Sequence, residues 1–542
     1  MQGLMQDWPL RVSAIIDHAA RYHGGRTIVS RMVEGPLART SWAELRGRSL
    51  RFVQALRRLG VRPGDVIGCM AWNTARHLEV WYGVPGAGAV LHSLNPRLGQ
   101  EQLAYIAGHA GDSWLICDAD LAPVVAGLLP ELPGVKGVIV LTDRAHMPGA
   151  LPDALCYEEL IAAEDGDAGW EPGEERDACG ICYTSGTTGH PKGVVYSHRS
   201  NVLHAMAMIQ PDMLGLSSRD VTMPVVPLFH ANGWSTGFSA PMAGTAMVLP
   251  GRLMDPASLY EMLEEGVTVT AAVPTVWLRL LAHLREKGLK LPHLDRVVIG
   301  GSSCPRAVIE AFQDDYGVRV LHAWGMTETS PLGTFASFKP EVAAMDPEER
   351  TAVQMKVGHP PFTVDLCIRD DAGRDLPWDG QTQGRLQIRG PGVLRRYLRQ
   401  DRDAIDAEGW FDTGDAATID ALGYVRITDR FKDVIKSGGE WISSLEMENA
   451  AVSHPDVAEA AAVGVPHPKW DERPVLCVVP KPGRTPTAEE ILDRLRPHFA
   501  RWQLPDEILF VDEIPHTATG KISKLTLRRR LEAEGYRLPD QR

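Results

Sequence analysis

Alternating helix and strand signals are the feature that most constrains the fold of this chain. Residues 41–44, Ser-Trp-Ala-Glu, form a capping box, and the apolar spacing that follows predicts an amphipathic helix that ends before Gly60. A strand over residues 66–71 follows, and the order returns as a helix over 256–266 and a strand over 267–273. Repeated helix and strand pairs predict an α/β body with mostly parallel sheets.

The pattern changes beyond about residue 357. Short strand signals with turn residues between them, over 364–369, 384–389 and 423–428, predict a small β lobe. A compact α+β stretch follows, with capped helices that begin after Ser443 and Thr487. We therefore predict a large N-terminal domain, residues 1–428, made of α/β subdomains and the β lobe, and a small α+β domain over 429–542.

Composition excludes several classes of protein. The chain has 542 residues, of which 44% are hydrophobic and 23% charged, which supports several cores and excludes a disordered or collagen-like chain. Lys and Arg number 56 against 69 Asp and Glu, and the net charge of -13 argues against wrapping of nucleic acid. We expect a cytoplasmic protein without an integral membrane segment, because neither a signal sequence nor a long apolar run occurs.

Eight cysteines in a chain of this length do not indicate a disulfide framework, and they favour a reducing compartment. Cys179 and Cys182 are the one closely spaced pair. A C-x-x-C pair can serve redox chemistry or bind a metal, but a second Cys or His pair at zinc spacing does not follow. We favour the interpretation of two small residues on a buried strand.

A loop rich in Gly and Thr follows an apolar strand at residues 183–193, Tyr-Thr-Ser-Gly-Thr-Thr-Gly-His-Pro-Lys-Gly. Its glycines allow backbone N–H groups to face a phosphate, its hydroxyls add donors or a magnesium ligand, and Lys192 adds a positive charge. Pro191 stands where the Walker A loop has a glycine, so this is a different phosphate loop. Taken alone, the pattern fits a flexible surface turn equally well.

Five further motifs follow this loop in order. They are residues 324–329 (Trp-Gly-Met-Thr-Glu-Thr), 410–415 (Trp-Phe-Asp-Thr-Gly-Asp), 429–433 (Asp-Arg-Phe-Lys-Asp), 436–440 (Lys-Ser-Gly-Gly-Glu) and 519–521 (Thr-Gly-Lys). Together the motifs resemble the adenylate-forming superfamily of acyl-CoA synthetases, luciferases and nonribosomal-peptide adenylation domains, over about residues 40 to 530. The resemblance implies that the small C-terminal domain rotates about a hinge at Asp429 between two half-reactions.

The chemistry of that superfamily accounts for these residue types. A carboxylate reacts with ATP to give an acyl-AMP, and a thiol then displaces AMP; the first step gathers negative charges and requires Mg²⁺ and cations. The resemblance implies that Thr184 and Glu328 bind the Mg²⁺, and that Lys521 bridges the substrate carboxylate and the α-phosphate. Outside this context, Glu328 and Lys521 would be ordinary solvated charges.

The resemblance also implies contacts with the nucleotide and with CoA. Asp415 is expected to accept both ribose hydroxyls, although an Asp in such a motif can also serve only as a turn former. The family most often has Tyr where this chain has Trp324, and either ring can stack on a base. The expected nucleotide contacts are Thr184, Ser185, Gly186, Thr187, Thr188, Gly189, Lys192, Gly301, Ser302, His322, Ala323, Trp324, Gly325, Met326, Thr327, Glu328, Asp415, Arg430, Lys432, Lys436, Trp441 and Lys521. The segment expected to serve thioester formation is Lys436, Ser437, Gly438, Gly439 and Glu440.

Residues 227–234, Pro-Leu-Phe-His-Ala-Asn-Gly-Trp, resemble the wall of the family's acyl pocket. The resemblance places His230 near the reacting carboxylate as a catalytic residue, and Asn232, Trp234 and Gly300 around the acyl group. Trp234 is a candidate aromatic gate, with simple core packing as the alternative. Peptide-type adenylation domains usually have an Asp in this region, and its absence here disfavours an amino acid substrate.

Residues 436–444 and 465–474 look most like two branches of the superfamily. One comprises medium- and long-chain fatty acid CoA ligases, and the other comprises bacterial CoA ligases for 3-(methylthio)propionate. We therefore expect an ATP-dependent carboxylic acid:CoA ligase, and a homodimer by resemblance. The alternatives are a luciferase-like adenylating oxygenase and a non-catalytic nucleotide-binding relative, the second of which is disfavoured because Lys521 and Glu328 are present.

Overall fold

The computed structural model describes residues 1, 3–184, 191–438, 440–516 and 522–538. The chain divides into two compact units. Unit 1 comprises Met1–Thr184, Pro191–Asp365 and Arg389–Phe411, and unit 2 comprises Leu366–Ile388 and the chain from Asp412 onward. The β lobe therefore groups with the C-terminal stretch, and the domain division at residue 429 stays a prediction.

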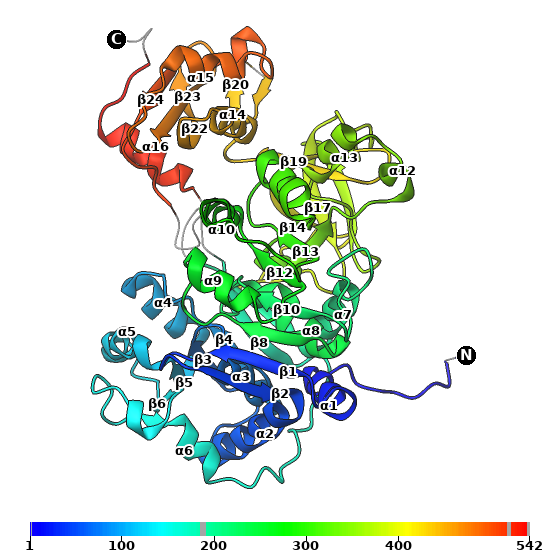
Figure 1. Ribbon diagram of the computed structural model, residues 1–542, viewed down its shortest axis with the longest axis vertical. Coiled ribbons are helices and arrows are strands. Elements are labelled where there is room, and N and C mark those ends of the chain that lie inside the picture. Colours follow the sequence, from blue (N-terminus) through cyan, green and yellow to red (C-terminus); the bar gives the residue numbers. More distant parts are fainter. Residues whose placement is uncertain (2, 185–190, 439, 517–521, 539–542) are drawn as a thin grey trace. The chain divides into compact units, whose positions relative to one another are not determined.

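A seven-stranded sheet forms one part of unit 1 (Figure 1). All neighbouring strands are parallel except the β8–β9 hairpin, which is antiparallel and flanks the Gly- and Thr-rich loop. In spatial order the strands are β7 (Leu155–Cys156), β6 (Val138–Val140), β5 (Asp112–Cys117), β3 (Val66–Met70), β4 (Val90–Ser93), β8 (Ala178–Tyr183) and β9 (Gly193–Ser197).

An eight-stranded sheet forms the other part of unit 1. Only its edge pairs, β14–β15 and β1–β2, are antiparallel. In spatial order the strands are β15 (Leu332–Phe335), β14 (Arg319–Gly325), β13 (Arg296–Ile299), β12 (Val269–Ala272), β10 (Val221–Pro224), β11 (Ala246–Leu249), β1 (Thr27–Arg31) and β2 (Leu37–Ser41). The predicted α/β body with mostly parallel sheets is confirmed.

Helices form three layers around these two sheets. Alternate residues of a strand face opposite layers: Ile67 of β3 packs into the core between the sheets, and Met70 packs into the core on the outer face. The central layer contains α1 (Val12–Tyr22), α2 (Trp42–Arg58), α3 (Ala75–Gly86), α6 (Tyr157–Ala162), α7 (His198–Met208) and α8 (Thr236–Ala243). The outer layers contain α4 (Gln100–Ala110) and α5 (Ala122–Leu128) on the seven-stranded sheet, and α9 (Pro256–Leu263), α10 (Pro274–Lys287) and α11 (Arg306–Glu310) on the eight-stranded sheet.

Several local predictions can be compared with these elements. Ser41 caps α2 by accepting from the backbone N–H of Glu44, and Gly60 follows the helix with φ +79°. The expected strand over residues 267–273 is β12. Cys179 and Cys182 are buried on β8, and none of the eight cysteines, all of which lie in the described ranges, forms a disulfide. The interpretation of two small residues on a buried strand is therefore confirmed.

Unit 2 contains two smaller sheets. The four-stranded sheet is the predicted β lobe, and the five-stranded sheet belongs to the predicted α+β stretch, where Ser443 and Thr487 cap their helices as expected. The strands are β16 (Asp365–Arg369), β17 (Gly384–Arg389), β18 (Phe411–Ile419) and β19 (Val425–Arg430), then β21 (Glu440–Ile442), β20 (Ile435–Ser437), β23 (Asp471–Pro480), β22 (Val457–His467) and β24 (Glu507–Phe510). The helices are α14 (Ser444–Val452), α15 (Ala488–Leu495) and α16 (Lys524–Ala533).

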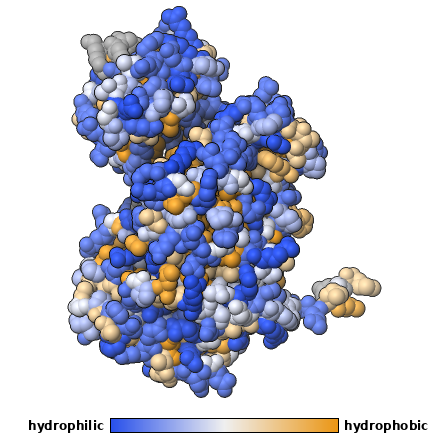
Figure 2. Space-filling model, in the orientation of Figure 1, coloured by the Kyte–Doolittle hydropathy of each residue, from blue (hydrophilic) through white to orange (hydrophobic). Residues whose placement is uncertain are grey.

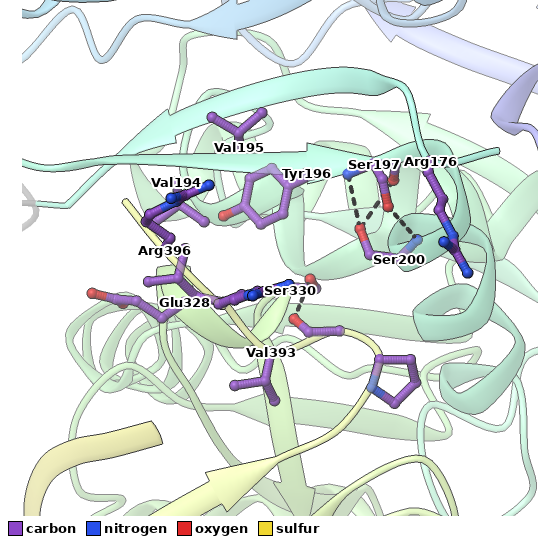
Figure 3. Close-up of a pocket in the computed structure, with 14 residues that line it drawn as sticks. Arg176, Val194, Val195, Tyr196, Ser197, Ser200, Glu328, Ser330, Val393 and Arg396 are labelled. Carbon is purple, nitrogen blue, oxygen red and sulfur yellow. Dashed lines mark hydrogen bonds between the residues drawn. The ribbon is translucent and has the colours of Figure 1, made fainter. Parts of the chain in front are cut away.

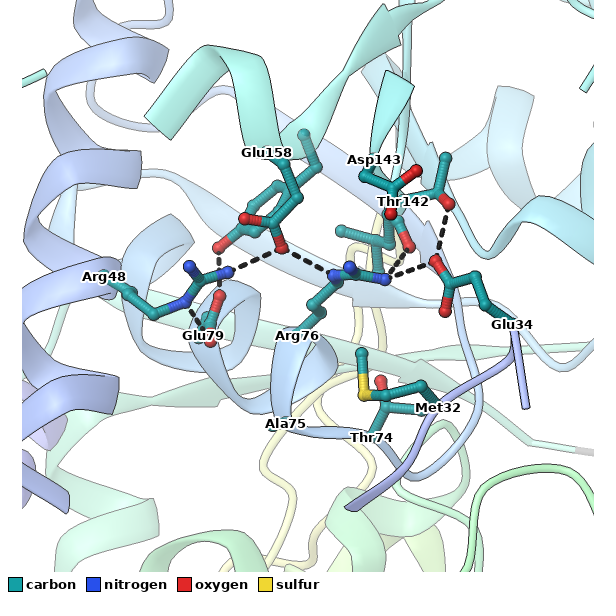
Figure 4. A network of polar contacts seen from close by, with 12 residues as sticks. Met32, Glu34, Arg48, Thr74, Ala75, Arg76, Glu79, Thr142, Asp143 and Glu158 are labelled. Carbon is teal, nitrogen blue, oxygen red and sulfur yellow. Dashed lines mark hydrogen bonds and ion pairs between the residues drawn. The ribbon is translucent and has the colours of Figure 1, made fainter. Parts of the chain in front are cut away.

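A network of ion pairs joins the elements around the seven-stranded sheet (Figure 4). Glu158 of α6 accepts from Arg48 of α2 and from Arg76 of α3, each at 2.8 Å. Arg48 also pairs with Glu79 at 2.7 Å, and Arg76 pairs with Glu34 at 2.6 Å. Because each arginine binds two carboxylates from different elements, the network fixes α2, α3 and α6 against the β1–β2 turn.

The face of the molecule in Figure 2 is largely hydrophilic, and its hydrophobic residues lie in small separate groups. Among the helices of the described ranges, none combines the length and the apolar character that a membrane crossing requires.

Candidate functional site

Thr184 and Lys192 flank the Gly- and Thr-rich loop and bond to each other. The backbone N–H of Thr184 donates to the carbonyl of Lys192 at 2.9 Å, and the N–H of Lys192 donates to Thr184 Oγ1 at 3.3 Å. The ends of the loop are therefore held together by the β8–β9 hairpin. The predicted contacts Ser185, Gly186, Thr187, Thr188 and Gly189 lie outside the described residues.

Glu328 lies in a 3₁₀ turn over Thr327–Thr329 and is 7% exposed. The hydroxyl of Tyr397 donates to Glu328 Oε1 at 2.7 Å. The ammonium of Lys192 lies 4.8 Å from the centre of the Tyr397 ring, within the range of a cation–π contact. Tyr397 therefore connects the cation at the end of the phosphate loop with the carboxylate expected to bind magnesium.

Segment 391–398 carries Tyr397 and is bonded at two points by its backbone. The N–H of Leu394 donates to the carbonyl of Glu328 at 2.7 Å, and the N–H of Leu398 donates to the carbonyl of Gly193 at 2.9 Å. An open pocket borders this region, and Figure 3 shows Tyr196, Ser330 and Val393 around Glu328. The turn that carries Glu328 is thus fixed between β9 and segment 391–398.

The residues of the expected adenine slot come from two neighbouring strands. Parallel strands β13 and β14 pair Ile299 with His322, so the exposed Gly301 and Ser302 after β13 lie next to the end of β14. Burial lowers the pKa of His322, which keeps its imidazole neutral at pH 7. Trp324, which is 8% exposed, is the penultimate residue of β14. The strand and the turn after it also carry Ala323, Gly325, Met326 and Thr327.

Two of the expected acyl-pocket residues, Trp234 and Gly300, are in contact. His230 precedes a 3₁₀ turn over Ala231–Ser235 that contains Asn232 and Trp234. The Trp234 backbone has φ +52°, which is rare for a bulky residue and recurs at ligand sites. Its ring packs on Gly300, where an added Cβ would lie 3.0 Å from Trp234 Cη2. Gly300 therefore allows the indole to lie directly against the backbone.

Asp415 and Arg430 are cross-strand partners on β18 and β19 in unit 2. Asp415 is 2% exposed, and its Oδ1 lies 2.8 Å from Arg430 Nε. Asp415 lies within a strand and not in a turn, with Gly414 before it at φ +72°. The pair thus presents a fixed carboxylate beside a half-exposed guanidinium, and the contacts with a ribose and a phosphate stay a prediction.

The expected thioester-forming segment lies on the β20–β21 hairpin. Lys436 and Trp441 are register partners there, and Trp441 meets Phe431 edge to face with ring centres 5.0 Å apart. Gly438 has φ +63° and donates its N–H to the carbonyl of Trp470 at 2.8 Å. Ser437 is buried, whereas Lys432, Lys436 and Glu440 are exposed, and Gly439 lies outside the described residues.

Asp429, the expected hinge, is 2% exposed and bonded to α14. Its Oδ2 accepts from the backbone N–H and the hydroxyl of Ser444, each at 2.6 Å. Lys524 of α16 donates to the Ser444 hydroxyl and pairs with Glu448 of α14 at 2.8 Å. Lys521, the expected catalytic lysine, lies outside the described residues, but Lys524 follows it by three positions and is fixed in this buried cluster.

Tyr397 and Lys524 are the two site-associated residues that the sequence reasoning missed. Tyr397 lies two residues before a polar stretch, Arg-Gln-Asp-Arg-Asp at 399–403, and Lys524 follows the Thr-Gly-Lys motif on an amphipathic helix. Neither has a spacing signal of its own, because its partners are 69 and 76 positions away in the sequence. Proximity to a recognised motif was the available signal for Lys524.

Comparison with known proteins identifies the family of the chain. The model of the AMP-binding enzyme family matches residues 16–398, and that of the AMP-binding enzyme C-terminal domain matches residues 446–521. The chain therefore belongs to the AMP-binding enzyme family, whose members are adenylate-forming enzymes.

Curated relatives match the chain over nearly its whole length. It is 48% identical over 530 residues to a 3-methylmercaptopropionyl-CoA ligase of Ruegeria lacuscaerulensis, covering 97% of this chain and 98% of the relative. It is 44% identical to a medium-chain-fatty-acid–CoA ligase of Ectopseudomonas oleovorans, with 97% of each chain covered. A long-chain-fatty-acid–CoA ligase of Thermus thermophilus is 45% identical, with 97% of this chain and 96% of the relative covered.

Solved structures confirm the adenylate-forming fold. The structure of the anthranilate CoA ligase AuaEII in complex with anthranoyl-AMP aligns with a TM-score of 0.85 at 24% identity, covering 98% of this chain and 100% of that chain. ATP-bound MatB from Rhodopseudomonas palustris aligns with a TM-score of 0.83 at 25% identity, covering 97% of this chain and 99% of that chain.

Proposed function

We propose that this protein is an ATP-dependent carboxylic acid:CoA ligase that acts through an acyl-AMP. The observation that carries the proposal is the group formed by Thr184, Lys192, Tyr397 and Glu328 at the base of the phosphate loop. A hydroxyl, an ammonium and an oriented carboxylate are the groups that a magnesium-bound triphosphate requires. Mg²⁺, ATP and CoA are therefore the proposed cofactor and co-substrates.

In the first half-reaction, a substrate carboxylate oxygen forms a bond to the α-phosphorus of ATP, and the bond from that phosphorus to pyrophosphate breaks. Glu328 and Thr184 would hold Mg²⁺, which neutralises phosphate charge when bound. Mg²⁺ commonly takes one or two protein carboxylates and completes its shell with phosphate oxygens and water, so this donor set fits the ion. Lys192 would place a positive charge beside the β- and γ-phosphates. Lys521 would bridge the substrate carboxylate and the α-phosphate.

In the second half-reaction, the CoA thiol attacks the acyl carbonyl, a thioester forms and AMP leaves. We propose that Asp415 and Arg430 retain the ribose and phosphate of AMP during this step, while Gly438 and Gly439 allow the thiol to approach. We also propose that the C-terminal domain begins at the hinge residue Asp429, because the two family models end and begin on either side of it, at residues 398 and 446.

The proposed acid is 3-(methylthio)propionate or a medium- to long-chain fatty acid. The relatives that support these choices are similar in identity and coverage. The packing of Trp234 on Gly300 supports an acyl pocket whose depth depends on the position of the indole. We further propose a homodimer and a cytoplasmic location, the second in keeping with eight cysteines in the described residues that form no disulfide.

The test is product formation from ATP, Mg²⁺ and a panel of acids from acetate to palmitate that includes 3-(methylthio)propionate, with and without CoA. We expect an acyl-CoA together with AMP and pyrophosphate. Formation of AMP without any acyl-CoA would refute the ligase and favour a luciferase-like oxygenase. Failure to consume ATP with every acid would favour a non-catalytic nucleotide-binding relative.

Gly438→Ala is expected to slow thioester formation and to spare adenylation. The backbone at Gly438 has φ +63°, where a side chain costs about 1–2 kcal/mol, and the added Cβ would lie 3.1 Å from Trp470 Cε3. The strain would displace the backbone that the thiol approaches. The measurement is the rate of acyl-CoA formation from supplied acyl-AMP, beside acid-dependent exchange of pyrophosphate into ATP.

Gly483→Ala is the matched control. Gly483 also has a positive φ, +73°, but nothing lies within 4 Å of an added Cβ. This variant is expected to lose similar stability and to keep the wild-type rate of thioester formation. Equal loss of both half-reactions in Gly438→Ala would contradict the role given to Gly438.

A further inference from the structure

Tyr397 makes two side-chain contacts, each with a different part of the site. Its hydroxyl donates to Glu328 Oε1 at 2.7 Å, and its ring lies 4.8 Å from the ammonium of Lys192. The second oxygen of Glu328 has no hydrogen-bond partner among the described residues. The phenol therefore occupies one carboxylate oxygen and leaves the other available for a ligand.

The position of segment 391–398 does not depend on this phenol. Leu394 and Leu398 already bond to the carbonyls of Glu328 and Gly193, and Ser330 Oγ donates to the carbonyl of Gly392 at 2.6 Å. Three hydrogen bonds thus hold the segment without the Tyr397 side chain. The hydroxyl acts on the orientation of a carboxylate, because a donor on one oxygen fixes the plane of the group.

We propose that Tyr397 is a positioning residue for the adenylation half-reaction. Its hydroxyl orients the Glu328 carboxylate toward the cation of the nucleotide complex, and its ring holds the Lys192 ammonium beside that carboxylate. One side chain thereby sets the relative position of the two charged groups that meet the phosphates. This inference rests on the proposed ligase function and adds to it a residue outside the recognised motifs.

The role predicts different effects for the two parts of the side chain. Tyr397→Phe keeps the ring and removes the donor, so the Mg²⁺ concentration needed for half-maximal ATP binding is expected to rise by about tenfold, the typical effect of losing a bond to a metal ligand. Tyr397→Leu also removes the ring, so ATP binding is expected to weaken further even at saturating Mg²⁺. Thioester formation from supplied acyl-AMP is expected to keep its wild-type rate in both variants.

Tyr196→Phe is the matched control. The Tyr196 hydroxyl is buried and donates at 2.6 Å to the carbonyl of Thr327, one residue before Glu328, but it does not touch the carboxylate. Its loss is expected to lower thermal stability and to leave the Mg²⁺ dependence of ATP binding unchanged. Calorimetric titrations with ATP at several Mg²⁺ concentrations, and with AMP in the absence of Mg²⁺, measure these effects directly.

An unchanged Mg²⁺ dependence in Tyr397→Phe would overturn the proposal, as would an equal shift in Tyr196→Phe. Loss of AMP binding without Mg²⁺ in Tyr397→Phe would also overturn it, because that result indicates a general defect of the fold. Acid-dependent pyrophosphate exchange by the wild-type protein is measured first. Its absence would refute the proposed ligase function and not the role of Tyr397, whose readout is binding.

Discussion

Lys521→Ala is expected to reduce acid-dependent pyrophosphate exchange by about 10²–10³-fold, the usual effect of removing a group that stabilises charge in a transition state. The lysine is proposed to bridge the substrate carboxylate and the α-phosphate in adenylation alone. Thioester formation from supplied acyl-AMP should therefore stay close to the wild-type rate. Stopped assays of the two half-reactions measure the difference.

Lys481→Ala is the control for this prediction. Lys481 lies in the same C-terminal segment, and its ammonium donates to the carbonyl of Pro455. Its removal changes the net charge by the same amount and should leave both half-reactions intact. An equal loss of both half-reactions in Lys521→Ala would contradict the model of two domain orientations.

Lys524→Met is expected to destabilise the C-terminal segment by about 3–5 kcal/mol, the usual cost of removing one partner from a buried ion pair. Lys524 is 10% exposed at its side chain and pairs with Glu448, which is 9% exposed. Asp429 lies in the same cluster through Ser444. Without the ammonium, two buried carboxyl groups would share one site.

The destabilisation is expected to depend on pH. Burial raises the pKa of Glu448 to about 7 from 4.5, with Lys524 opposing the rise. A carboxyl group whose folded pKa is raised binds more protons in the folded state, so its contribution to stability falls as pH rises from about 4.5 through about 7. Loss of Lys524 raises this pKa further, so the deficit of the variant should be larger near pH 8 than near pH 6.

Urea unfolding of the wild type and the variant at both pH values tests this expectation. Adding Glu448→Gln to Lys524→Met removes a buried charge and should restore part of the lost stability near pH 8. A double variant no more stable than Lys524→Met would show that the ion pair does not account for the loss.

Much of the fold could be predicted from local patterns. The capped helix after Ser41, the strands β12 and β17, and the helices after Ser443 and Thr487 depend on short-range spacing that the sequence displays directly. The grouping of the β lobe with the C-terminal segment was not predictable in this way. It depends on contacts between distant strands and helices, which leave no periodic signal in the sequence.

The site shows the same distinction. Motifs located Thr184, Lys192, Glu328, Asp415 and Arg430 because the residues of each motif are adjacent in the chain. Tyr397 could not be found that way, since its hydroxyl meets a carboxylate 69 positions earlier. The identity of the acid is proposed to depend on the volume around Trp234, which is set by packing and not by the order of residues.

Asp429 and Arg430 are consecutive residues of β19 whose side chains have different partners. Asp429 bonds to Ser444 of α14, and Arg430 bonds to Asp415 of β18. Successive side chains of a strand point to opposite faces, so a single peptide unit separates the proposed hinge from the proposed ribose contact. Rotation about the backbone bonds on either side of this peptide unit would therefore act on the proposed ribose contact as directly as on the C-terminal segment. Departure of AMP would then be coupled to the same backbone rotations that are proposed to change the domain orientation.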